Sequence, residues 1–430
     1  MNLSRLSSQL LTLTAIAICA MSASASLAQA SHACDPKAYG VSSDGKTSNT
    51  KALQAAIDGC SRAGGGVIHL TAGTYLSGPL ALKSHVHLDL DEDATLLGST
   101  NFDEYPVRPD APWRRIALIH ADDQTDIGIT GKGTIDGNGQ PWWDKAHTTH
   151  LAGDTLGSAG FARPLLFDLV RSKHILIQGV HIRNSPMYNI TLFLCDDITI
   201  RDISIKNPAT GAPNTDGIDP FSSSHIIIDH VTIDTGDDCI AIKSGLLERG
   251  EPVIPSSDIT ITNSTLLHGH GLSIGSETAG GVHNVTVDHV TFKGTDAGIR
   301  IKSNRTRGND MGNYKYSNIT MEDVKVPILI TEYYPRIPTT DTAQPMAEHT
   351  PRFHDIVITN VTATGARDAG VIMGLPESPI KGLVLTNVRI SAAKGMTVQN
   401  ADVVMKDVTV KAEAGEAIQI GDHAHITKTN

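Results

Sequence analysis

A short motif recurs nine times along the chain, and it constrains the fold more than any other feature. Each copy has a polar first residue, apolar residues at alternate positions, two polar residues, and then apolar residues again. Successive copies begin 20 to 37 residues apart, and the first residues are His174, Asp197, His225, Asp258, Asn284, Asn318, Asp355, Gly382 and Asp402. Short β-branched strands between Gly, Asn and Asp turns, repeating in one phase without helical patterns between them, are typical of a solenoid of parallel strands.

Other all-β architectures fit this pattern less well. A sandwich or barrel also has many short strands, but it does not repeat one motif with the same internal phase. The 39 glycines and the low aromatic content of 4% agree with short strands and tight turns. We therefore predict an all-β chain folded as a right-handed parallel β-helix.

An open end of a solenoid is an unpaired sheet edge that needs a cover. In Asn49 to Cys60, the residues Leu53, Ala56, Ile57 and Cys60 have helical spacing on one face, and glycines follow from Gly64. This pattern predicts a short N-terminal capping helix, with Asn49 or Thr50 as its N-cap.

The first 30 residues have the pattern of a secretory signal peptide. Arg5 precedes an apolar run from Leu10 to Ala20, and the small-residue site Ala28-Gln29-Ala30 follows. The run is shorter than the roughly 20 residues of a membrane-spanning helix. We expect a signal peptide over residues 1–30, one catalytic β-helix domain over residues 31–430, and a secreted protein that reaches the exterior directly or through the periplasm.

Four cysteines remain after the signal peptide. Cys34 and Cys60 bracket the N-terminal segment and could form one disulfide in an oxidising compartment, whereas Cys195 and Cys239 lie in strand-like runs and are expected to be buried thiols. The absence of CxxC or Cys/His clusters argues against a zinc site, and we expect no metal and no cofactor.

The charge balance limits the partners. Without Arg5 the chain has 34 Lys and Arg against 46 Asp and Glu, which makes a nucleic-acid partner implausible. A polyanionic substrate would have to be attracted by a local basic cluster. We expect a monomer that binds neither nucleic acid nor membrane.

Unusual polar residues recur at similar offsets from the motif starts. Residues at similar offsets lie on one face of a solenoid, with coils about 4.8 Å apart. Five consecutive coils should therefore line one groove with an acid, an acid pair, a histidine, a basic pair and a tyrosine: Asp216, Asp237 with Asp238, His270, Arg300 with Lys302, and Tyr334.

Each of these features also has a plain structural explanation. The Asp237-Asp238 pair and the segment from Asn214 to Pro220 could be ordinary turns, and His270 a surface histidine. The segment from Arg300 to Gly308 could be a solvated edge, although four cations in eight residues reverse the sign of an acidic chain. Their common order and phase favour a functional groove.

The side chains suit cleavage of an acidic polysaccharide. Glycoside hydrolysis needs one protonated carboxyl for the leaving oxygen and one carboxylate that activates water or attacks carbon. Crowded carboxylates at Asp216, Asp237 and Asp238 could retain one proton, which His270 could tune. Arg300 and Lys302 alternate along a strand, so both can face one sugar carboxylate. 

At these residues the sequence resembles the polygalacturonases of glycoside hydrolase family 28. The resemblance covers nearly the whole mature chain, and its specific part is an ordered set of four motifs: NTD from Asn214, GDD from Gly236, GHG from Gly269 and RIK from Arg300. Each motif alone is weak, but the ordered set is specific. The resemblance implies hydrolysis of α-1,4-galacturonosidic bonds in pectate, an acidic plant cell-wall polysaccharide, by an inverting mechanism.

The resemblance also implies a role for each residue. Asp237 is the implied general acid, and Asp216 with Asp238 the implied groups that activate water. His270 would aid protonation of the site. The implied substrate-binding residues are Asn214, Arg300, Lys302 and Tyr334, although Tyr333 beside Tyr334 leaves the choice between the two tyrosines open.

Three alternatives remain at this stage. Another pectic polymer, such as rhamnogalacturonan or xylogalacturonan, could be the substrate on the same fold. A pectate lyase would use the acids to hold calcium, and a binding solenoid would need no catalytic acids.

The coil spacing itself places carboxylates about 5 Å apart, nearer the retaining geometry than the inverting one. Whether cleavage is endo or exo depends on loops that close the groove, of which residues 335–353 are the first candidate.

Overall fold

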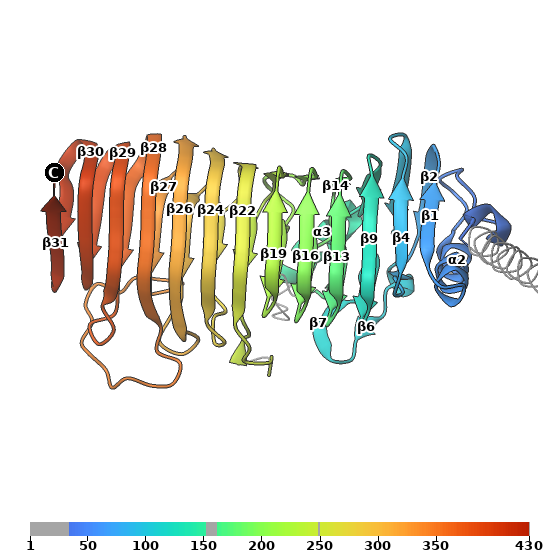
Figure 1. Cartoon of the computed structure of the whole chain (residues 1–430), viewed down its shortest axis with the longest axis horizontal. Helices are drawn as coiled ribbons and strands as arrows, with labels where there is room; N and C mark the ends of the chain where they lie inside the picture. The colour runs from blue at the N-terminus through green and yellow to red at the C-terminus, as the bar shows by residue number, and fades with distance from the viewer. Residues whose placement is uncertain (1–33, 152–160, 248–249, 430) are drawn as a thin grey trace, which may run out of the picture.

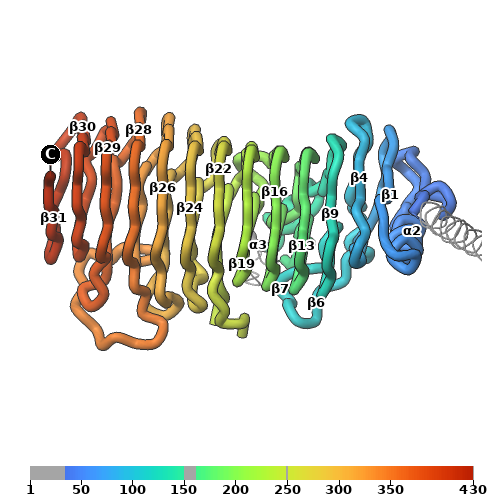
Figure 2. Tube along the Cα trace, viewed as in Figure 1, coloured from blue at the N-terminus to red at the C-terminus, as the bar shows by residue number. Residues whose placement is uncertain are grey.

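The computed structural model describes residues 34–151, 161–247 and 250–429. In these residues the chain winds into a right-handed parallel β-helix whose coils stack along one axis, from the helix α2 at one end to β31 at the other (Figure 1). Figure 2 traces the coils lying beside one another along the whole axis. The predicted fold class is therefore confirmed, whereas the predicted signal peptide lies outside the described residues.

Three faces of parallel strands make the solenoid. The first face consists of β1 (Gly66–Leu70), β4 (Val86–Leu90), β9 (Thr125–Gly131), β13 (Lys173–Gln178), β16 (Asp196–Arg201) and β19 (Ser224–Asp229). The second face consists of β2 (Gly73–Ser77), β5 (Ala94–Gly98), β10 (Thr134–Asp136), β14 (His181–Arg183), β17 (Ser204–Lys206) and β20 (Thr232–Asp234).

The third face carries the residues predicted for the site. It consists of β3 (Leu80–Ala81), β8 (Ile119–Asp122), β12 (Phe167–Val170), β15 (Ile190–Phe193), β18 (Ile218–Phe221), β21 (Ile240–Ile242), β23 (Leu272–Ile274), β25 (Ala297–Lys302) and β27 (Val326–Thr331).

Toward the C-terminus the strands become long and run around the corners. These are β22 (Ser256–Leu267), β24 (Val282–Lys293), β26 (Asp310–Glu322), β28 (Arg352–Met373), β29 (Ile380–Gln399), β30 (Ala401–Ile420) and the final β31 (Ala424–Thr429). β22 pairs with both β19 and β20, and β28 with both β26 and β27, so one strand spans two faces. Each coil thereby forms hydrogen bonds with the next.

The polar residues of the repeated motif form its corners. The first residues of the seven copies from His174 to Asp355 have φ between 52° and 57°. Asn, Asp and His tolerate this left-handed conformation better than other non-glycine residues do. A second left-handed residue, such as Asp202 or His230, turns the chain between the first and second faces. The motif is therefore two short strands, with one left-handed residue as the second residue of the first strand and another between the two strands.

The alternate apolar residues form one continuous core along the axis. Ile and Val side chains of matching register stack coil upon coil, as in the series Ile198, Ile226, Ile259, Val285 and Tyr314, all buried. Branched side chains pack well on such a pleated surface. Among the described residues, no helix is long and apolar enough to cross a bilayer.

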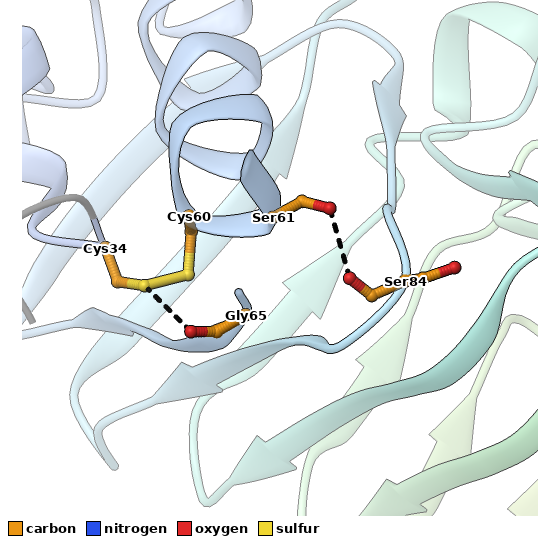
Figure 3. Close-up of a disulfide and its surroundings, with 5 residues drawn as sticks. All are labelled: Cys34, Cys60, Ser61, Gly65 and Ser84. Carbon is orange, nitrogen blue, oxygen red and sulfur yellow. Dashed lines mark hydrogen bonds between the residues drawn. A yellow bond between two sulfur atoms is a disulfide. The ribbon is translucent and has the colours of Figure 1, made fainter. Parts of the chain in front are cut away.

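A short segment covers the N-terminal coil. The helix α2 (Thr50–Arg62) buries Leu53, Ala56, Ile57 and Cys60, which confirms the predicted capping helix. A disulfide joins Cys34 to Cys60 across Gly65, and the Ser61 hydroxyl donates to the Ser84 carbonyl (Figure 3). Gly65 has φ of 94°, and a Cβ there would lie 2.3 Å from the His85 carbonyl oxygen, so only glycine fits this approach.

One detail of the cap differs from the prediction. Asn49 precedes the helix, but its side chain makes no capping hydrogen bond. Instead the side-chain amide of Asn49 accepts from the Ser42 backbone N–H and donates to the Ser42 carbonyl. The buried Asn49 side chain therefore fixes the loop that precedes the helix. The Thr50 hydroxyl accepts from the Gly78 backbone N–H.

Several elements outside the repeat were not predicted. A second helix, α3 (Gln140–Leu151), buries Trp142 and Trp143, and the Trp143 indole N–H donates to the Ser185 carbonyl. Its apolar residues gather at its start, so the sequence shows too few helical periods to indicate a helix. The 3₁₀ turns η1 (Pro36–Tyr39) and η2 (Phe102–Glu104) and a small sheet of β6 (Val107–Arg108), β7 (Ala111–Arg115) and β11 (Arg163–Pro164) complete the fold.

Candidate active site

The register of the third face brings the predicted residues to one line. Asp216, Asp238 and His270 each lie two residues before the first residues of β18, β21 and β23, which pair with one another. Because paired positions in adjacent coils are about 4.8 Å apart, the three side chains follow one another along the axis. Asp237 and Asp238 therefore lie between Asp216 and His270.

The adjacent acids Asp237 and Asp238 both reach the site because the chain bends ahead of β21, at Gly236 and Asp237. The backbone N–H of Asp238 donates to the Asp237 carboxylate at 2.8 Å. His270 Nδ1 lies 3.0 Å from one carboxylate and 3.9 Å from the other. The bend presents both side chains to one imidazole, whereas a regular strand would have pointed them to opposite sides.

Asp238 is the buried member of the pair, with a side chain that is 4% exposed against 24% for Asp237. Three donors hold it: Arg300 Nη1 at 2.8 Å, Lys302 Nζ at 2.7 Å and the Ser273 hydroxyl at 2.8 Å. Burial favours the neutral carboxyl, but Lys302 and Arg300 outweigh it and hold the pKa of Asp238 well below its usual range. Asp238 is thus a carboxylate at all ordinary pH values.

Arg300 and Lys302 project from the same side of β25, as their alternation predicted. Their cationic groups contact opposite oxygens of one carboxylate. A guanidinium has five N–H donors and an ammonium three, so both groups keep donors that Asp238 does not use. Both can also bind an anion that enters the groove.

The Asp237 carboxylate is the more open acid, and its side-chain partner is His270. The hydrogen bond that His270 donates to Asp237 is the largest of the effects that raise the pKa of the His270 imidazole, and it outweighs partial burial. A protonated imidazole donates Nδ1–H to Asp237 and can pass a proton to it. His270 Nε2 lies 3.7 Å from Asp296 on the opposite side.

Asp216 occupies a different environment from Asp238. Burial, with repulsion from Asp237 and Asp219, raises the pKa of Asp216 well above its usual range. Lys243 Nζ lies 3.5 Å from Asp216 and 3.6 Å from Asp219, and it lies 4.8 Å from the Tyr188 ring centroid. Asp216 therefore holds a proton more readily than Asp238 does, although the family resemblance implies that both activate water.

Asn214 contacts a buried arginine. Its side-chain oxygen accepts from Arg163 Nη2 at 2.7 Å, and the Arg163 Nη1 donates to the Pro186 and Pro213 carbonyls. Burial lowers the pKa of Arg163 to about 10. Asn214 is thus fixed in its left-handed turn, with φ of 56°, two residues before Asp216.

The two candidate tyrosines lie in different surroundings. Lys302 Nζ lies 5.2 Å from the Tyr334 ring centroid, so Tyr334 borders the cationic side of the site. Tyr333 is buried against Met373 and Leu375, and its hydroxyl donates to Asp341. Tyr334 is therefore the tyrosine at the groove.

The ligand atoms of Asp237, Asp238 and His270 lie within 4.8 Å of one another, which is a spacing that could hold a metal ion. Arg300 and Lys302 already contact Asp238, so a divalent cation would meet two positive charges there. These two positive charges therefore disfavour a divalent cation at this cluster.

Sequence reasoning missed four residues of this site: Arg163, Asp219, Lys243 and Ser273. Asp219 and Lys243 follow the NTD and GDD motifs at alternate strand positions, so the alternation used for Arg300 and Lys302 could have indicated them. Ser273 occupies the position paired with Arg300. Arg163 has no local signal, because its partners lie more than 20 residues away.

A profile described as glycosyl hydrolases family 28 matches residues 60–410. The chain belongs to this family. It is therefore a glycoside hydrolase, and the resemblance stated from the sequence is confirmed.

Family 28 relatives align over most of the chain. An endo-polygalacturonase of Pectobacterium carotovorum subsp. carotovorum is 34% identical over 381 residues, covering 84% of this chain and 87% of that protein. A probable polygalacturonase of Vitis vinifera is 32% identical, covering 83% and 73%.

Solved structures of the family share the fold. The polygalacturonase from Erwinia carotovora ssp. carotovora superposes with a TM-score of 0.66 at 30% identity, covering 89% of this chain and 92% of that one. The exopolygalacturonase from Thermotoga maritima superposes with a TM-score of 0.69 at 25% identity, covering 91% of each chain. Similar family 28 proteins thus include both endo and exo enzymes.

Proposed function

We propose that this glycoside hydrolase cleaves α-1,4-galacturonosidic bonds of polygalacturonan. The observation that carries the proposal is the pair Arg300 and Lys302, two cations beside catalytic carboxylates in a chain of net negative charge. Both cations contact Asp238 and keep further donors, and a uronate carboxylate can form ionic hydrogen bonds with these donors whereas a neutral sugar cannot. The polygalacturonase names of the relatives support the same substrate class.

In the proposed mechanism Asp237 is the general acid. It is the most exposed acid of the cluster and bonds to the imidazole of His270, which has a raised pKa and can resupply the proton. The leaving glycosidic oxygen would take the proton from Asp237. Asp237 is then reprotonated from His270 and solvent.

Asp238 is the proposed water-activating carboxylate, and Asp216 shares the same water. Lys302 and Arg300 keep Asp238 ionised, as a base requires. Asp216 has a raised pKa, so we assign it the weaker share of the proton abstraction and a role in orienting the water. Water between these carboxylates and the anomeric carbon gives the inverting outcome.

Incubation with polygalacturonate in the presence of a chelator tests the proposal. We expect reducing ends without added calcium and no ultraviolet absorption from an unsaturated product, and the reducing end released from each α-bond should appear first as the β-anomer. An unsaturated product would instead indicate a lyase, and activity confined to rhamnogalacturonan or xylogalacturonan would replace the proposed substrate. The lengths of the earliest products decide between endo and exo cleavage.

We also propose that the protein is secreted and acts as a monomer on plant cell-wall pectate. The Cys34–Cys60 disulfide supports an oxidising compartment. Mass spectrometry of protein from the culture medium should give an N-terminus near Ser31, and light scattering should give the mass of one chain.

A further inference from the structure

A hollow opens beside His270, on the side of the site that leads toward the C-terminal coils. Its lining includes the half-buried Leu329 of β27. The lining side chains are His270, Asp296, Ala297, Arg300, Lys325, Val326, Leu329 and Arg367. The hollow is continuous with the candidate active site, because His270 and Arg300 belong to both.

Three charged residues of the hollow, Asp296, Lys325 and Arg367, follow the same line along the axis as Asp237. Asp237 lies three residues before Ile240, the first residue of β21. The equivalent positions, three residues before the partners of Ile240 in later coils, are Gly269, Asp296, Lys325 and Arg367. Lys325 is therefore three coils beyond Asp237, or about 14 Å along the axis, and Arg367 is one coil further.

A polymer that lies along the groove would pass over these positions. Asp237 would contact the cleaved bond, and Arg300 a unit beside it. A unit further along would meet Lys325, Arg367 and the apolar Leu329. Apolar and charged side chains that line one hollow suit a sugar ring that carries a carboxylate.

Three cations line the hollow, Arg300, Lys325 and Arg367. Each already contacts one carboxylate, that of Asp238, Asp296 or Asp368 respectively. An anionic ligand would therefore bind through the donors that these contacts leave available.

Lys325 and Arg367 are each held by one carboxylate and keep further N–H donors for a ligand. Lys325 Nζ contacts Asp296 at 2.5 Å, and Arg367 Nε contacts Asp368 at 2.6 Å. The backbone N–H of Arg367 donates to the Lys325 carbonyl, which joins the two residues. One carboxylate partner leaves further donors on both an ammonium and a guanidinium.

The geometry points to a second carboxylate-binding subsite, formed by Lys325 and Arg367, that holds a uronate unit beyond the one contacted by Arg300. This inference rests on the proposed function for its ligand, an oligogalacturonate. It assigns these two residues to binding of the extended chain and not to the bond-breaking step.

Equilibrium binding of hexagalacturonate to the Asp237→Asn protein, measured by titration calorimetry, tests the subsite. Adding Lys325→Gln and Arg367→Gln should weaken binding by about tenfold, as expected for the loss of two charge-assisted contacts at an exposed site. The difference in hexagalacturonate affinity between the parent and this variant should become smaller at high salt, because exposed charges are screened. It should also shrink for digalacturonate, which is too short to reach both the cleavage point and Lys325.

A matched control carries Lys293→Gln and Arg389→Gln in the same Asp237→Asn background. Lys293 resembles Lys325 in side-chain exposure, 59% against 57%, and Arg389 resembles Arg367, 51% against 63%. Both control residues pair with a carboxylate 3.0 Å away, outside the hollow. The control should bind hexagalacturonate as the parent does.

The outcomes separate this inference from the proposed function. If the wild-type protein cleaves polygalacturonate but the Lys325/Arg367 variant binds as tightly as the control, the subsite is refuted and the function stands. If cleavage fails while hexagalacturonate binding still depends on Lys325 and Arg367, the function is refuted and the subsite stands. Hexagalacturonate binding too weak to detect in the Asp237→Asn parent refutes the subsite.

Discussion

Lys302 donates a 2.7 Å hydrogen bond to Asp238, so a residue expected to bind substrate is already bound to a residue expected to activate water. Arg300 contacts the other oxygen of the same carboxylate at 2.8 Å. The two cations therefore have two tasks, because they keep Asp238 ionised and also attract the carboxylate of a uronate. The more buried cation should matter more for ionisation and the more exposed one for binding.

Substitution of the two cations should separate these tasks. Arg300→Gln should raise KM for polygalacturonate by about tenfold with a smaller loss in kcat, since it removes one charge-assisted contact. Lys302→Met should lower kcat by at least about a hundredfold at pH 5, because the pKa of Asp238 rises when its closest cation is lost. The low-pH limb of its pH–rate profile, where Asp238 becomes protonated, should move to higher pH. An unchanged KM in Arg300→Gln would contradict the clamp, and Lys293→Gln serves as the surface control.

Much of the fold could be predicted from the sequence because residue types in the repeat follow the backbone conformation and burial of each position. Asp197 and Asn284 are polar where the backbone is left-handed, and the apolar residues after them alternate because every second side chain faces the core. The helix α3 could not be predicted in this way, since its two tryptophans pack against non-local partners such as Phe102 and Ser185.

The site was predictable where strand alternation or a motif recorded it. Arg300 and Lys302 share a side of β25, as alternation requires. The opposite ionisation of Asp216 and Asp238 was not predictable, because it depends on which cation reaches each carboxylate across coils. Offsets along the chain place residues on a face but do not report side-chain contacts.

Substitution of the two tyrosines should distinguish the groove from the core. Tyr334→Ala should lower kcat/KM on polygalacturonate by about tenfold, the effect of losing one aromatic contact. Tyr333→Phe removes a hydroxyl that donates to Asp341, so it should lower the free energy of unfolding by about 1 kcal/mol. Steady-state kinetics and urea unfolding of both variants check this assignment. A larger kinetic effect in Tyr333→Phe than in Tyr334→Ala would reverse it.

Removal of the disulfide should destabilise the N-terminal cap. The bond closes 26 residues of chain, so replacing Cys34 and Cys60 by Ser should lower the free energy of unfolding by about 3 kcal/mol. Reductant should have the same effect on the wild-type protein and no effect on this variant. Cys195→Ala is the control for a buried free thiol, because its stability should still respond to reductant.

The pH dependence of stability should reveal the buried carboxyl of Asp219. Burial raises the pKa of Asp219 to about 7, although Lys243 at 3.6 Å opposes the rise. A carboxyl with a raised pKa in the folded state stabilises the fold below its ordinary pKa near 4, and this contribution is lost as the pH rises toward 7. 

Asp219→Asn removes this titration while it keeps the shape of the side chain. Between pH 4 and pH 8 the wild-type protein should therefore lose on the order of 2 kcal/mol more unfolding free energy than the variant does. Urea unfolding at pH 4, 6 and 8 measures the difference, and Asp355→Asn at an exposed corner provides the matched control. Parallel pH curves for the wild-type protein and Asp219→Asn would show that Lys243 keeps Asp219 ionised throughout, and the buried cluster would then hold its proton on Asp216.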